Sequence, residues 1–545
     1  MRAADYLVQS LKAHGIKRVY CVPGESYLAL LDALHASGID VVVCRHEGGA
    51  GFMACAEAKL TGEPVVFMVS RGPGATNASI AIHMAEQDAL PVILLVGQIP
   101  REERSRKVFQ EMDYGKVFGS FTKGVFEVED GARLHELLPR GIHMAREGVP
   151  GPVIFSLPED MLNDDVPERE PVVFPLARVG DGASSMPDIQ ALIDGAERPV
   201  VVAGGALRSA AGKAALQRFA EAQRLPVAVT WKNQEIFDNA SPLYAGHLGF
   251  GAAAALKNAL AESDLILAIG TRLGDVASLG YTFPETPAPR QTLVHIYPDS
   301  RPIGFNFRTD LGLVADPVAV MNGLSQGARV VNAAREAWIS KLNGVVRSLQ
   351  AFKPVDADDG VDFGVITELL ARLAPKDAII TTDAGNISTW AHRHWKMSPS
   401  NTLIGGIVGA MGLGVPAAVA ASLAQPQRTA ICLVGDGGVL MTGQELATAR
   451  AAGAAPKIVI SDNGIYGTIR THQEREYPGR VSGTNLKNPD FADWARSFGA
   501  ASFAIARGDN DMEGTVSAFL SAPGPAVLHV KSSKIALSAN GQLRP

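Results

Sequence analysis

The chain has 545 residues, with 50 Lys and Arg against 56 Asp and Glu, which gives a net charge of −6 at pH 7. This mild negative charge excludes a nucleic-acid binder that works by neutralising phosphates. The composition, 47% hydrophobic and 19% charged, excludes a mainly disordered chain, and the length predicts several domains.

The first predicted domain covers residues 1–165 and repeats strand–helix units. Residues 1–15 have the pattern of an amphipathic helix and lack the apolar core of a signal peptide, so we expect a cytoplasmic protein. Helical patterns also cover residues 26–38 and 48–62. Apolar runs predict four buried parallel strands, at residues 19–24, 39–45, 64–70 and 90–98. An acidic, proline-rich stretch predicts a linker over residues 157–182.

Two further α/β domains are predicted, at residues 186–326 and 357–535. The first has candidate strands at residues 198–205, 225–231, 264–270 and 292–298. A join at 327–359, containing a helix over 334–352, precedes the last domain. Its candidate strands cover residues 378–385, 430–438, 456–464 and 525–533. We therefore predict an α/β fold of three doubly wound parallel sheets, followed by a loosely ordered tail from residue 535.

Two other features bear on the fold. The stretch Leu403 to Gln425 carries no charge and is long enough to cross a membrane, but its glycines and proline favour close packing against another subunit or a ligand. The cysteines form no CxxC pair and lie in apolar runs, so they are predicted to be buried, reduced thiols: Cys21, Cys44, Cys55 and Cys432.

A candidate metal site follows two strands of the last domain. Gly435-Asp436-Gly437-Gly438 comes directly after one strand, and Asp462-Asn463-Gly464 comes directly after the next. The spacing suits one helical crossover, so both motifs should lie at the same carboxyl edge of the sheet. Oxygens from Asp436, Asn463 and the Ile465 carbonyl, together with ligand phosphates, suit Mg²⁺. The glycines let a phosphate approach the backbone.

This pair of motifs resembles the diphosphate-and-magnesium motif of thiamine diphosphate (ThDP) enzymes. The resemblance extends over the chain, through residues 45–62, 70–77, 90–100 and 108–113, and is closest to the large-subunit branch of the acetolactate synthases. It implies an N-terminal pyrimidine-binding domain, a middle domain and a C-terminal diphosphate-binding domain. ThDP and Mg²⁺ are the implied cofactors.

The resemblance also implies the roles of individual residues. Glu47 occupies the position of the glutamate that bonds to the cofactor's pyrimidine ring, and Met411 that of the apolar residue that supports its bent shape. The implied catalytic residues are Glu47, Gln110 and Lys123. The implied cofactor contacts are Pro23, Gly24, Glu47, Pro73, Asn77, Asp383, Asn386, Met411, Gly435, Gly437, Gly438 and Tyr466. The implied metal ligands are Asp436, Asn463 and Ile465.

The sequence departs from the family at positions that select the acceptor. Val276 stands where acetohydroxyacid synthases carry an Arg, and His472 stands where they carry a Trp. Arg470 lies two residues before His472, and both could instead bind a more polar or anionic substrate. Residues 201–210 and 270–275 only partly resemble the family's flavin site, so the pattern leaves open whether FAD binds.

The resemblance implies decarboxylation of a 2-oxo acid and ligation of the remaining unit to a second carbonyl compound. A simple 2-oxo acid decarboxylase is the alternative, and a non-catalytic ThDP-fold subunit is the alternative from another class. The family builds its site across a two-fold interface, so a homodimer or homotetramer is expected. Neither a nucleic acid nor a membrane is an expected partner.

Overall fold

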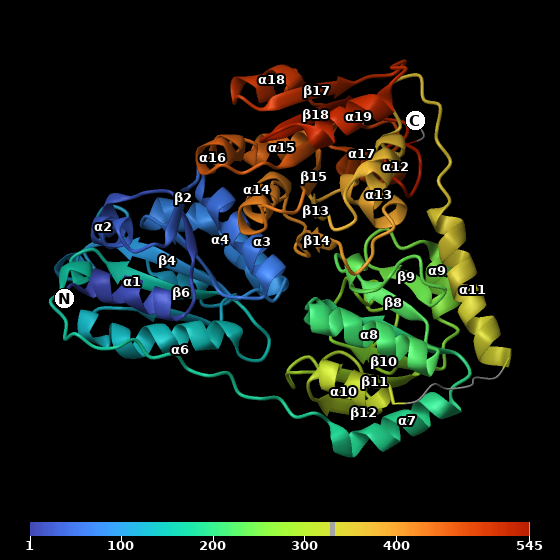
Figure 1. The fold of residues 1–545 in the computed structure, drawn as a ribbon, viewed down its shortest axis with the longest axis horizontal. Helices are drawn as coiled ribbons and strands as arrows, with labels where there is room; N and C mark the ends of the chain where they lie inside the picture. Colours follow the sequence, from blue (N-terminus) through green and yellow to red (C-terminus); the bar gives the residue numbers. More distant parts are fainter. Residues whose placement is uncertain (327–332, 544–545) are drawn as a thin grey trace.

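The computed structural model describes residues 1–326 and 333–543. These residues form three sheets of six strands, with helices packed against them (Figure 1). Neighbouring strands within each sheet run parallel. The α/β fold of three doubly wound parallel sheets predicted from the sequence is therefore confirmed.

The N-terminal sheet has the strand order β2-β1-β3-β4-β6-β5. Its strands are β1 (Arg18–Cys21), β2 (Asp40–Val43), β3 (Val65–Val69), β4 (Val92–Gln98), β5 (Gly124–Glu127) and β6 (Val153–Pro158). Its helices are α1 (Ala3–Ala13), α2 (Leu28–His35), α3 (Glu47–Thr61), α4 (Gly72–Gln87), α5 (Tyr114–Phe118) and α6 (Leu134–Arg146). The sequence predicted β1 to β4 but neither β5, which is half-buried along its length, nor β6.

The middle sheet has the strand order β12-β11-β10-β7-β8-β9. Its strands are β7 (Pro199–Ala203), β8 (Val227–Thr230), β9 (Tyr244–Leu248), β10 (Leu265–Ile269), β11 (Thr292–Tyr297) and β12 (Leu311–Val314). Its helices are α7 (Met186–Gly195), α8 (Ala210–Gln223), α9 (Ala254–Leu260), α10 (Pro317–Leu324) and α11 (Ala333–Gln350). The predicted helix over 334–352 corresponds to α11, and residues 327–332 of the predicted join lie outside the described residues.

The C-terminal sheet has the strand order β14-β13-β15-β16-β18-β17. Its strands are β13 (Ile379–Thr382), β14 (Thr402–Ile404), β15 (Ala430–Gly435), β16 (Lys457–Asp462), β17 (Ala501–Ile505) and β18 (Ala526–Lys531). Its helices are α12 (Phe363–Leu373), α13 (Ile387–His394), α14 (Gly414–Ala424), α15 (Asp436–Thr442), α16 (Glu445–Ala452), α17 (Gly467–Glu476), α18 (Phe491–Ser497) and α19 (Met512–Ser521).

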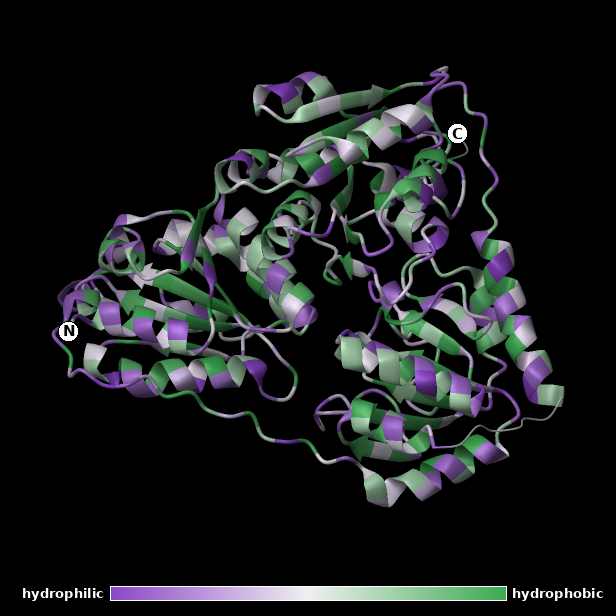
Figure 2. Ribbon diagram, in the orientation of Figure 1, coloured by the Kyte–Doolittle hydropathy of each residue, from purple (hydrophilic) through white to green (hydrophobic). Residues whose placement is uncertain are grey.

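Apolar side chains explain why these strands form buried parallel sheets. The strands of the three sheets are largely hydrophobic, whereas the helices mix hydrophobic and hydrophilic residues (Figure 2). Every residue of β3, β7, β10 and β16 is buried. Such strands are covered on both faces, which is the arrangement that parallel sheets require. The four cysteines are free and buried, as predicted.

The uncharged stretch 403–425 packs within the chain. It forms part of β14, a glycine-rich loop and α14, which lies against α3 of the N-terminal domain (Figure 1). Nine of the eleven residues of α14 are buried, and their small side chains allow this close approach. α14 therefore makes a contact between two domains of one chain, and the expected contact of this stretch with another subunit or a ligand stays a prediction. Among the described residues, no helix is long and apolar enough to cross a membrane.

Three local expectations were wrong. The stretch predicted as a linker from residue 157 begins inside β6, and only its later part, from residue 167, runs extended across the surface to α7 (Figure 1). The tail is packed over its described residues 535–543, since Ala536 and Leu537 are buried and the Arg393 guanidinium donates to the Ala539 carbonyl, and residues 544–545 lie outside the described residues. The single helix expected before β16 is divided into α15 and α16.

Candidate functional site

The order of the strands places the sequence motifs at two switch points. In the N-terminal sheet β1 lies between β2 and β3, and in the C-terminal sheet β13 lies between β14 and β15. The chain leaves the ends of such central strands in opposite directions, which opens a crevice at their carboxyl edge. Pro23 and Gly24 follow β1, and the turn from Asp383 to Asn386 follows β13.

The candidate metal ligands meet at the carboxyl ends of β15 and β16. These strands pair directly, with Gly435 opposite Ser461, so that Asp436 and Asn463 follow neighbouring strand ends. The Asp436 carboxylate is buried and accepts hydrogen bonds from the backbone of Gly437 at 2.8 Å and of Gly464 at 2.7 Å. Burial raises the pKa of Asp436 to about 6. No ion pair offsets this carboxylate among the described residues, so a bound divalent cation would stabilise it.

Asn488 joins this carboxylate to a second one and was not singled out from the sequence. Its side-chain amide donates to Asp436 Oδ2 and to Asp462 Oδ1, both at 2.8 Å. Burial opposes ionisation of Asp462, but hydrogen bonds from His529, Lys531 and Asn488 hold the pKa of this carboxyl well below its usual range. Asp462, which stands where the family has Asn, is thus fixed by Lys531 and His529 instead of facing the metal site.

Asn463 and Ile465 complete the proposed set of oxygen ligands. Asn463 is half-buried, and its Oδ1 accepts a hydrogen bond from the backbone of Ile465 at 3.2 Å. Gly464 between them has φ +68°, a left-handed conformation that favours glycine and turns the chain sharply here. One carboxylate, one amide oxygen and a backbone carbonyl are a donor set that fits Mg²⁺ alongside phosphates.

The turn after β13 is held by Asp383, which is 1% exposed. Its carboxylate accepts hydrogen bonds from the backbone of Ala384 at 2.7 Å and of Gly412 at 2.9 Å. Burial raises the pKa of Asp383 to about 6. Asp383 therefore ties its own turn to the loop that carries the half-buried Met411, and its buried carboxylate orders the loops instead of facing a ligand.

Two neighbours complete this side of the crevice. The Asn386 backbone donates to the Thr468 hydroxyl of α17 at 3.0 Å. No motif in the sequence predicted this contact. A Cβ added to Gly437 would lie 2.4 Å from the Tyr466 ring, whereas one added to Gly435 would meet nothing within 4 Å. The amino end of α15 is thus open at Gly435 and can accept an anionic group.

A second cluster lies in the N-terminal domain. Glu47 is the first residue of α3, and its Oε2 accepts a hydrogen bond from the Asn77 side chain at 3.0 Å. The Gln110 carbonyl accepts from the Gly72 backbone at 3.2 Å, which holds the loop carrying Gln110 over the turn that contains the exposed Pro73. The structure thus brings together Glu47, Asn77, Pro73 and Gln110.

Pro23 and Gly24 lie beside this cluster, at the end of β1. A Cβ added to Gly24 would lie 2.5 Å from the Ser70 side chain, so only glycine lets the ends of β1 and β3 approach so closely. A Cβ added to Gly74 would lie 3.6 Å from Glu47 Oε1, which places the Glu47 carboxylate over the turn at the start of α4. The cluster therefore sits at the switch point of the N-terminal sheet.

Lys123 lies away from this cluster. It immediately precedes β5, at the amino edge of the sheet, whereas Glu47 and Gly24 lie at the carboxyl edge. Its amine donates to the carbonyl of Glu147 at 2.5 Å and to that of Val149 at 2.9 Å. Lys123 thus holds the loop between α6 and β6, and its implied catalytic role stays a prediction.

Arg470 and His472 lie on α17, a helix without buried residues in a segment that the sequence predicted as a loop. Arg470 donates to the Thr484 hydroxyl at 2.9 Å and to the Asn485 side chain at 2.5 Å. His472 is exposed and contacts Arg475. The Arg470 guanidinium therefore holds α17 against residues 484–485, and His472 points to a neighbour on its own helix.

The partial flavin motifs meet at the switch point of the middle sheet, where β7 and β10 are neighbours. Their loops bond directly, because the Gly204 backbone donates to the Ile269 carbonyl and the Ala206 backbone to that of Gly270, both at 3.0 Å. A Cβ added to Gly205 would lie 2.8 Å from the Arg208 guanidinium, which bonds to Asn233. The Arg208 guanidinium therefore lies against the glycine turn that follows β7.

The N-terminal and C-terminal clusters are not bonded directly to one another. Among the described residues, no hydrogen bond or ion pair joins Glu47 or Asn77 to Asp436 or Asn463. The Asn77 side of α4 is also uncovered, and so is part of α15. The exposed residues there are Asn77, Ile80, His83, Leu440 and Met441.

Family models match all three domains. They are described as the N-terminal TPP binding domain, the central domain and the C-terminal TPP binding domain of thiamine pyrophosphate enzymes, and they match residues 1–117, 187–324 and 383–530. These matches and the buried, uncompensated Asp436 agree on the class of protein: a thiamine diphosphate-dependent enzyme.

Curated relatives narrow the class. The chain is 32% identical to an acetolactate synthase large subunit of Parasynechococcus marenigrum, over 97% of this chain and 87% of the relative. It is 30% identical to the acetolactate synthase isozyme 2 large subunit of Escherichia coli, over 98% and 96%. It is 32% identical to a probable acetolactate synthase large subunit of Methanocaldococcus jannaschii, over 96% and 90%. The chain belongs to the acetolactate synthase large-subunit family of thiamine diphosphate enzymes.

Proposed function

We propose that this chain is a cytoplasmic, Mg²⁺-dependent enzyme that decarboxylates a 2-oxo acid and joins the remaining acyl unit to a second carbonyl compound. The observation that carries the proposal is the Asp436 carboxylate at the end of β15. It is buried, forms no ion pair with a described side chain, and lies next to the open amino end of α15. The names of the relatives support ligation over simple decarboxylation.

When bound, ThDP supplies a nucleophilic carbon and accepts the electrons released as CO₂ leaves the substrate. Asp436, Asn463 and the Ile465 carbonyl would hold Mg²⁺ against the diphosphate. Gly435 and the turn from Asp383 to Asn386 would surround the phosphates, because open backbone donors at a helix start favour anions. Met411, between Gly409 (φ +71°) and Gly412 (φ +89°), would support the middle of the cofactor.

Glu47 would hold a proton at the pyrimidine end of the cofactor. The hydrogen bond from Asn77 fixes one carboxylate oxygen, so that the other stays free to bond to a ring nitrogen. Gln110 and Pro73, on the adjoining loops, would line the same space. A positioned carboxyl group of this kind contributes about 10²–10⁴-fold to a rate.

Selectivity for the acceptor is proposed to differ from that of the biosynthetic acetohydroxyacid synthases. Val276 removes the Arg of those enzymes, and Arg470 and His472 bring positive and titratable groups to the helix that follows the metal site. A panel of 2-oxo acids and aldehydes, with products identified by mass spectrometry, tests both the reaction and its selectivity. Ketol or 2-hydroxy-3-oxo acid products support ligation, and free aldehyde as the sole product would overturn it.

The same panel, run with the Arg470→Ala variant, tests whether Arg470 binds the substrate or only holds α17 in place. We expect KM for acidic substrates to rise about tenfold, while neutral substrates change less, because a guanidinium pairs with a carboxylate. Arg480→Ala, which removes an exposed arginine beyond α17, is the control. An equal loss for all substrates would show that Arg470 only holds α17 against residues 484–485.

We further propose that the middle domain lacks FAD, because Arg208 lies against the glycine turn after β7 and the loops after β7 and β10 bond directly to one another. The purified protein should show no flavin absorbance near ~450 nm, and added FAD should leave its activity unchanged. Flavin released by denaturing the purified protein in an amount equal to the protein would refute this proposal.

Finally, we propose a homodimer or a homotetramer in which Glu47 of one subunit and Asp436 of another serve the same cofactor. The exposed residues on α4 and α15, next to the two clusters, support this arrangement. A two-fold axis would then bury the same surface on both subunits.

Mixing two inactive variants tests the shared site. Glu47→Gln and Asp436→Asn subunits, allowed to exchange, should regain about one quarter of the wild-type activity, because half of the dimers are mixed and each has one intact site. Each variant exchanged with itself is the control and should stay inactive. No recovery, with mixed dimers confirmed by mass spectrometry, would place each site within one chain.

A further inference from the structure

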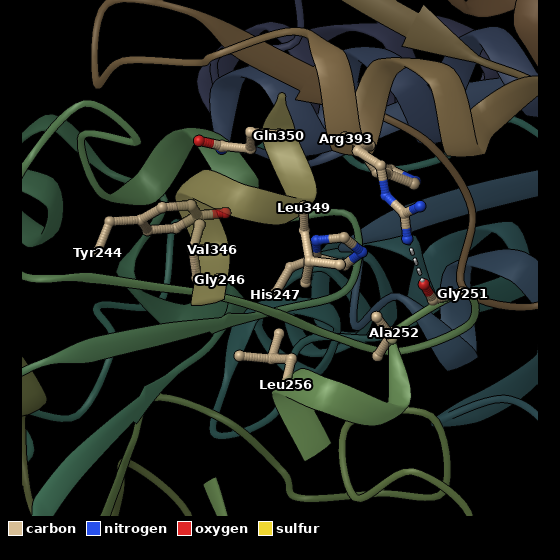
Figure 3. Close-up of a pocket in the computed structure, with 12 residues that line it drawn as sticks. Tyr244, Gly246, His247, Gly251, Ala252, Leu256, Val346, Leu349, Gln350 and Arg393 are labelled. Atoms are coloured by element: carbon tan, nitrogen blue, oxygen red, sulfur yellow. Dashed lines mark hydrogen bonds between the residues drawn. The ribbon is translucent and has the colours of Figure 1, made fainter. Parts of the chain in front are cut away.

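A small pocket lies between the middle and C-terminal domains, apart from both clusters described above. Residues of β9, α9 and α11 form its middle-domain side, and α13 contributes His392 and Arg393 (Figure 3). Its volume is about 30 Å³. That is enough for one or two water molecules or for a small ion, and too little for a substrate with a carbon skeleton of several atoms.

His392 is the unexplained polar group of this pocket. The residue is 4% exposed, and neither ring nitrogen has a hydrogen-bond partner. A neutral imidazole carries one N–H donor and one acceptor, and leaving both unpaired in the interior is unfavourable. His247, from β9, lies beside it, with ring centroids 5.6 Å apart. The pocket therefore offers a buried donor that awaits an acceptor.

The charges around the two rings have one sign. Burial lowers the pKa of His392 well below its usual range, and the charges of Lys232 and Lys59 act in the same direction. Burial, Arg393 and Lys232 lower the pKa of His247 to about 4. The residues that line the pocket include no Asp or Glu among those described. A cation would be repelled here, and an anion would be attracted.

Arg393 is the positively charged side chain that lines the pocket. It extends from α13, and its guanidinium donates to the Gly251 carbonyl at 3.4 Å and to the Ala539 carbonyl (Figure 3). Carbonyl oxygens do not neutralise a guanidinium. Burial lowers the pKa of Arg393, which shows that the charge lies in surroundings that disfavour it. A monovalent anion would balance this charge and accept the free N–H of His392.

We propose that the pocket at His247, His392 and Arg393 binds a small monovalent anion, in the size range from a halide ion to formate. The site is independent of the cofactor and of the proposed reaction. Halide and small carboxylate share the chemistry that the pocket recognises, namely a compact single charge that accepts hydrogen bonds. Ordered water alone is the competing occupant, and the test below separates the two.

Bromide is the probe, because its anomalous scattering distinguishes it from water. Crystals of the full chain soaked in sodium bromide should show an anomalous peak within ~3.5 Å of a His392 ring nitrogen. In solution, at constant ionic strength, replacing gluconate with bromide should raise the melting temperature by about 2 °C, because the bound anion stabilises only the folded state. Parallel titrations with chloride and formate identify which source of anion binds more tightly.

Two variants make the test specific. In His392→Leu the rise in melting temperature should disappear, and in His394→Leu, which alters a buried histidine of the same helix that does not line the pocket, it should remain. A peak in the crystal without any rise in solution would mean binding at crystal concentration only and would overturn the proposal. Water density without an anomalous peak would overturn it as well, and that measurement on the unaltered chain does not depend on the variants folding.

Discussion

Replacing Asp436 with asparagine should abolish catalysis while leaving the cofactor-free protein folded. The variant loses the one carboxylate of the proposed metal site, so we expect the affinity for ThDP with Mg²⁺ to fall by about 100-fold or more. Activity should fall in parallel, by about 10³-fold. Calorimetric titration of ThDP in the presence of Mg²⁺ measures the first effect, and steady-state turnover measures the second.

The free energy of unfolding of the metal-free variant should not fall along with its activity. Burial raises the pKa of Asp436 to about 6, so at pH 7 the ionised carboxylate lies in a site that disfavours its charge. In the folded chain without metal this group binds protons at a higher pH than in the unfolded chain. Stability is therefore lost as the pH rises from the ordinary Asp range through 6, by about 2–3 kcal/mol. Asparagine removes this cost.

The metal-free Asp436→Asn protein should melt within a few degrees of the wild type at pH 7, because the relieved charge offsets the hydrogen bonds that a single amide oxygen cannot accept from Gly437, Gly464 and Asn488. Asp493→Asn, which alters an exposed carboxylate of α18, is the control and should change neither affinity nor turnover. If Asp436→Asn bound ThDP and Mg²⁺ as the wild type does, the proposed metal site would be wrong. If the variant lost both binding and folding, Asp436 would instead be a structural residue.

Replacing Glu47 with glutamine should separate cofactor binding from cofactor activation. Glutamine keeps the size of the side chain and can still accept the hydrogen bond from Asn77. ThDP affinity should therefore change by less than about tenfold, since one neutral hydrogen bond replaces a charged one. The exchange of the C2 proton of bound ThDP should slow by about 10²–10⁴-fold, because the carboxyl group that favours this step is gone.

Proton exchange measured by NMR after acid quenching reads out this step without any substrate. Glu63→Gln, just beyond the carboxyl end of α3, alters an exposed acid and should leave the exchange rate unchanged. Wild-type exchange in Glu47→Gln would remove Glu47 from the site. A complete loss of ThDP binding would point to a binding role for Glu47 instead.

Most strands in the interior of the sheets were predictable, apart from the buried β6, and the edge strands were missed, apart from β2. The apolar runs that became β3, β4, β10 and β16 are buried throughout, so their composition alone identifies them. The edge strands β5, β12 and β17 are partly exposed and carry a mixed composition. Because one side of an edge strand faces solvent, local hydrophobicity does not reveal it.

The candidate site was predictable where motif and strand end coincide. Asp436 and Asn463 follow two strands that are neighbours in the sheet, so spacing along the chain sufficed to bring them together. Asn488 lies in a loop between α17 and α18, without a recognisable motif, and yet it bridges Asp436 and Asp462. Lys123 precedes β5 at the amino edge of the sheet, so the motif match alone did not predict its place in the fold, and its implied catalytic role stays a prediction.

The sequence by itself determined three α/β domains, the metal motif and the family, because each depends on residues close together in the chain. Only the tertiary structure decided that α14 lies against α3, that Arg208 bonds to Asn233 and that His392 meets His247 between two domains. The physical reason is that these contacts join segments far apart in the sequence. Their partners are chosen by the order of the strands and the packing of the domains, which no local pattern contains.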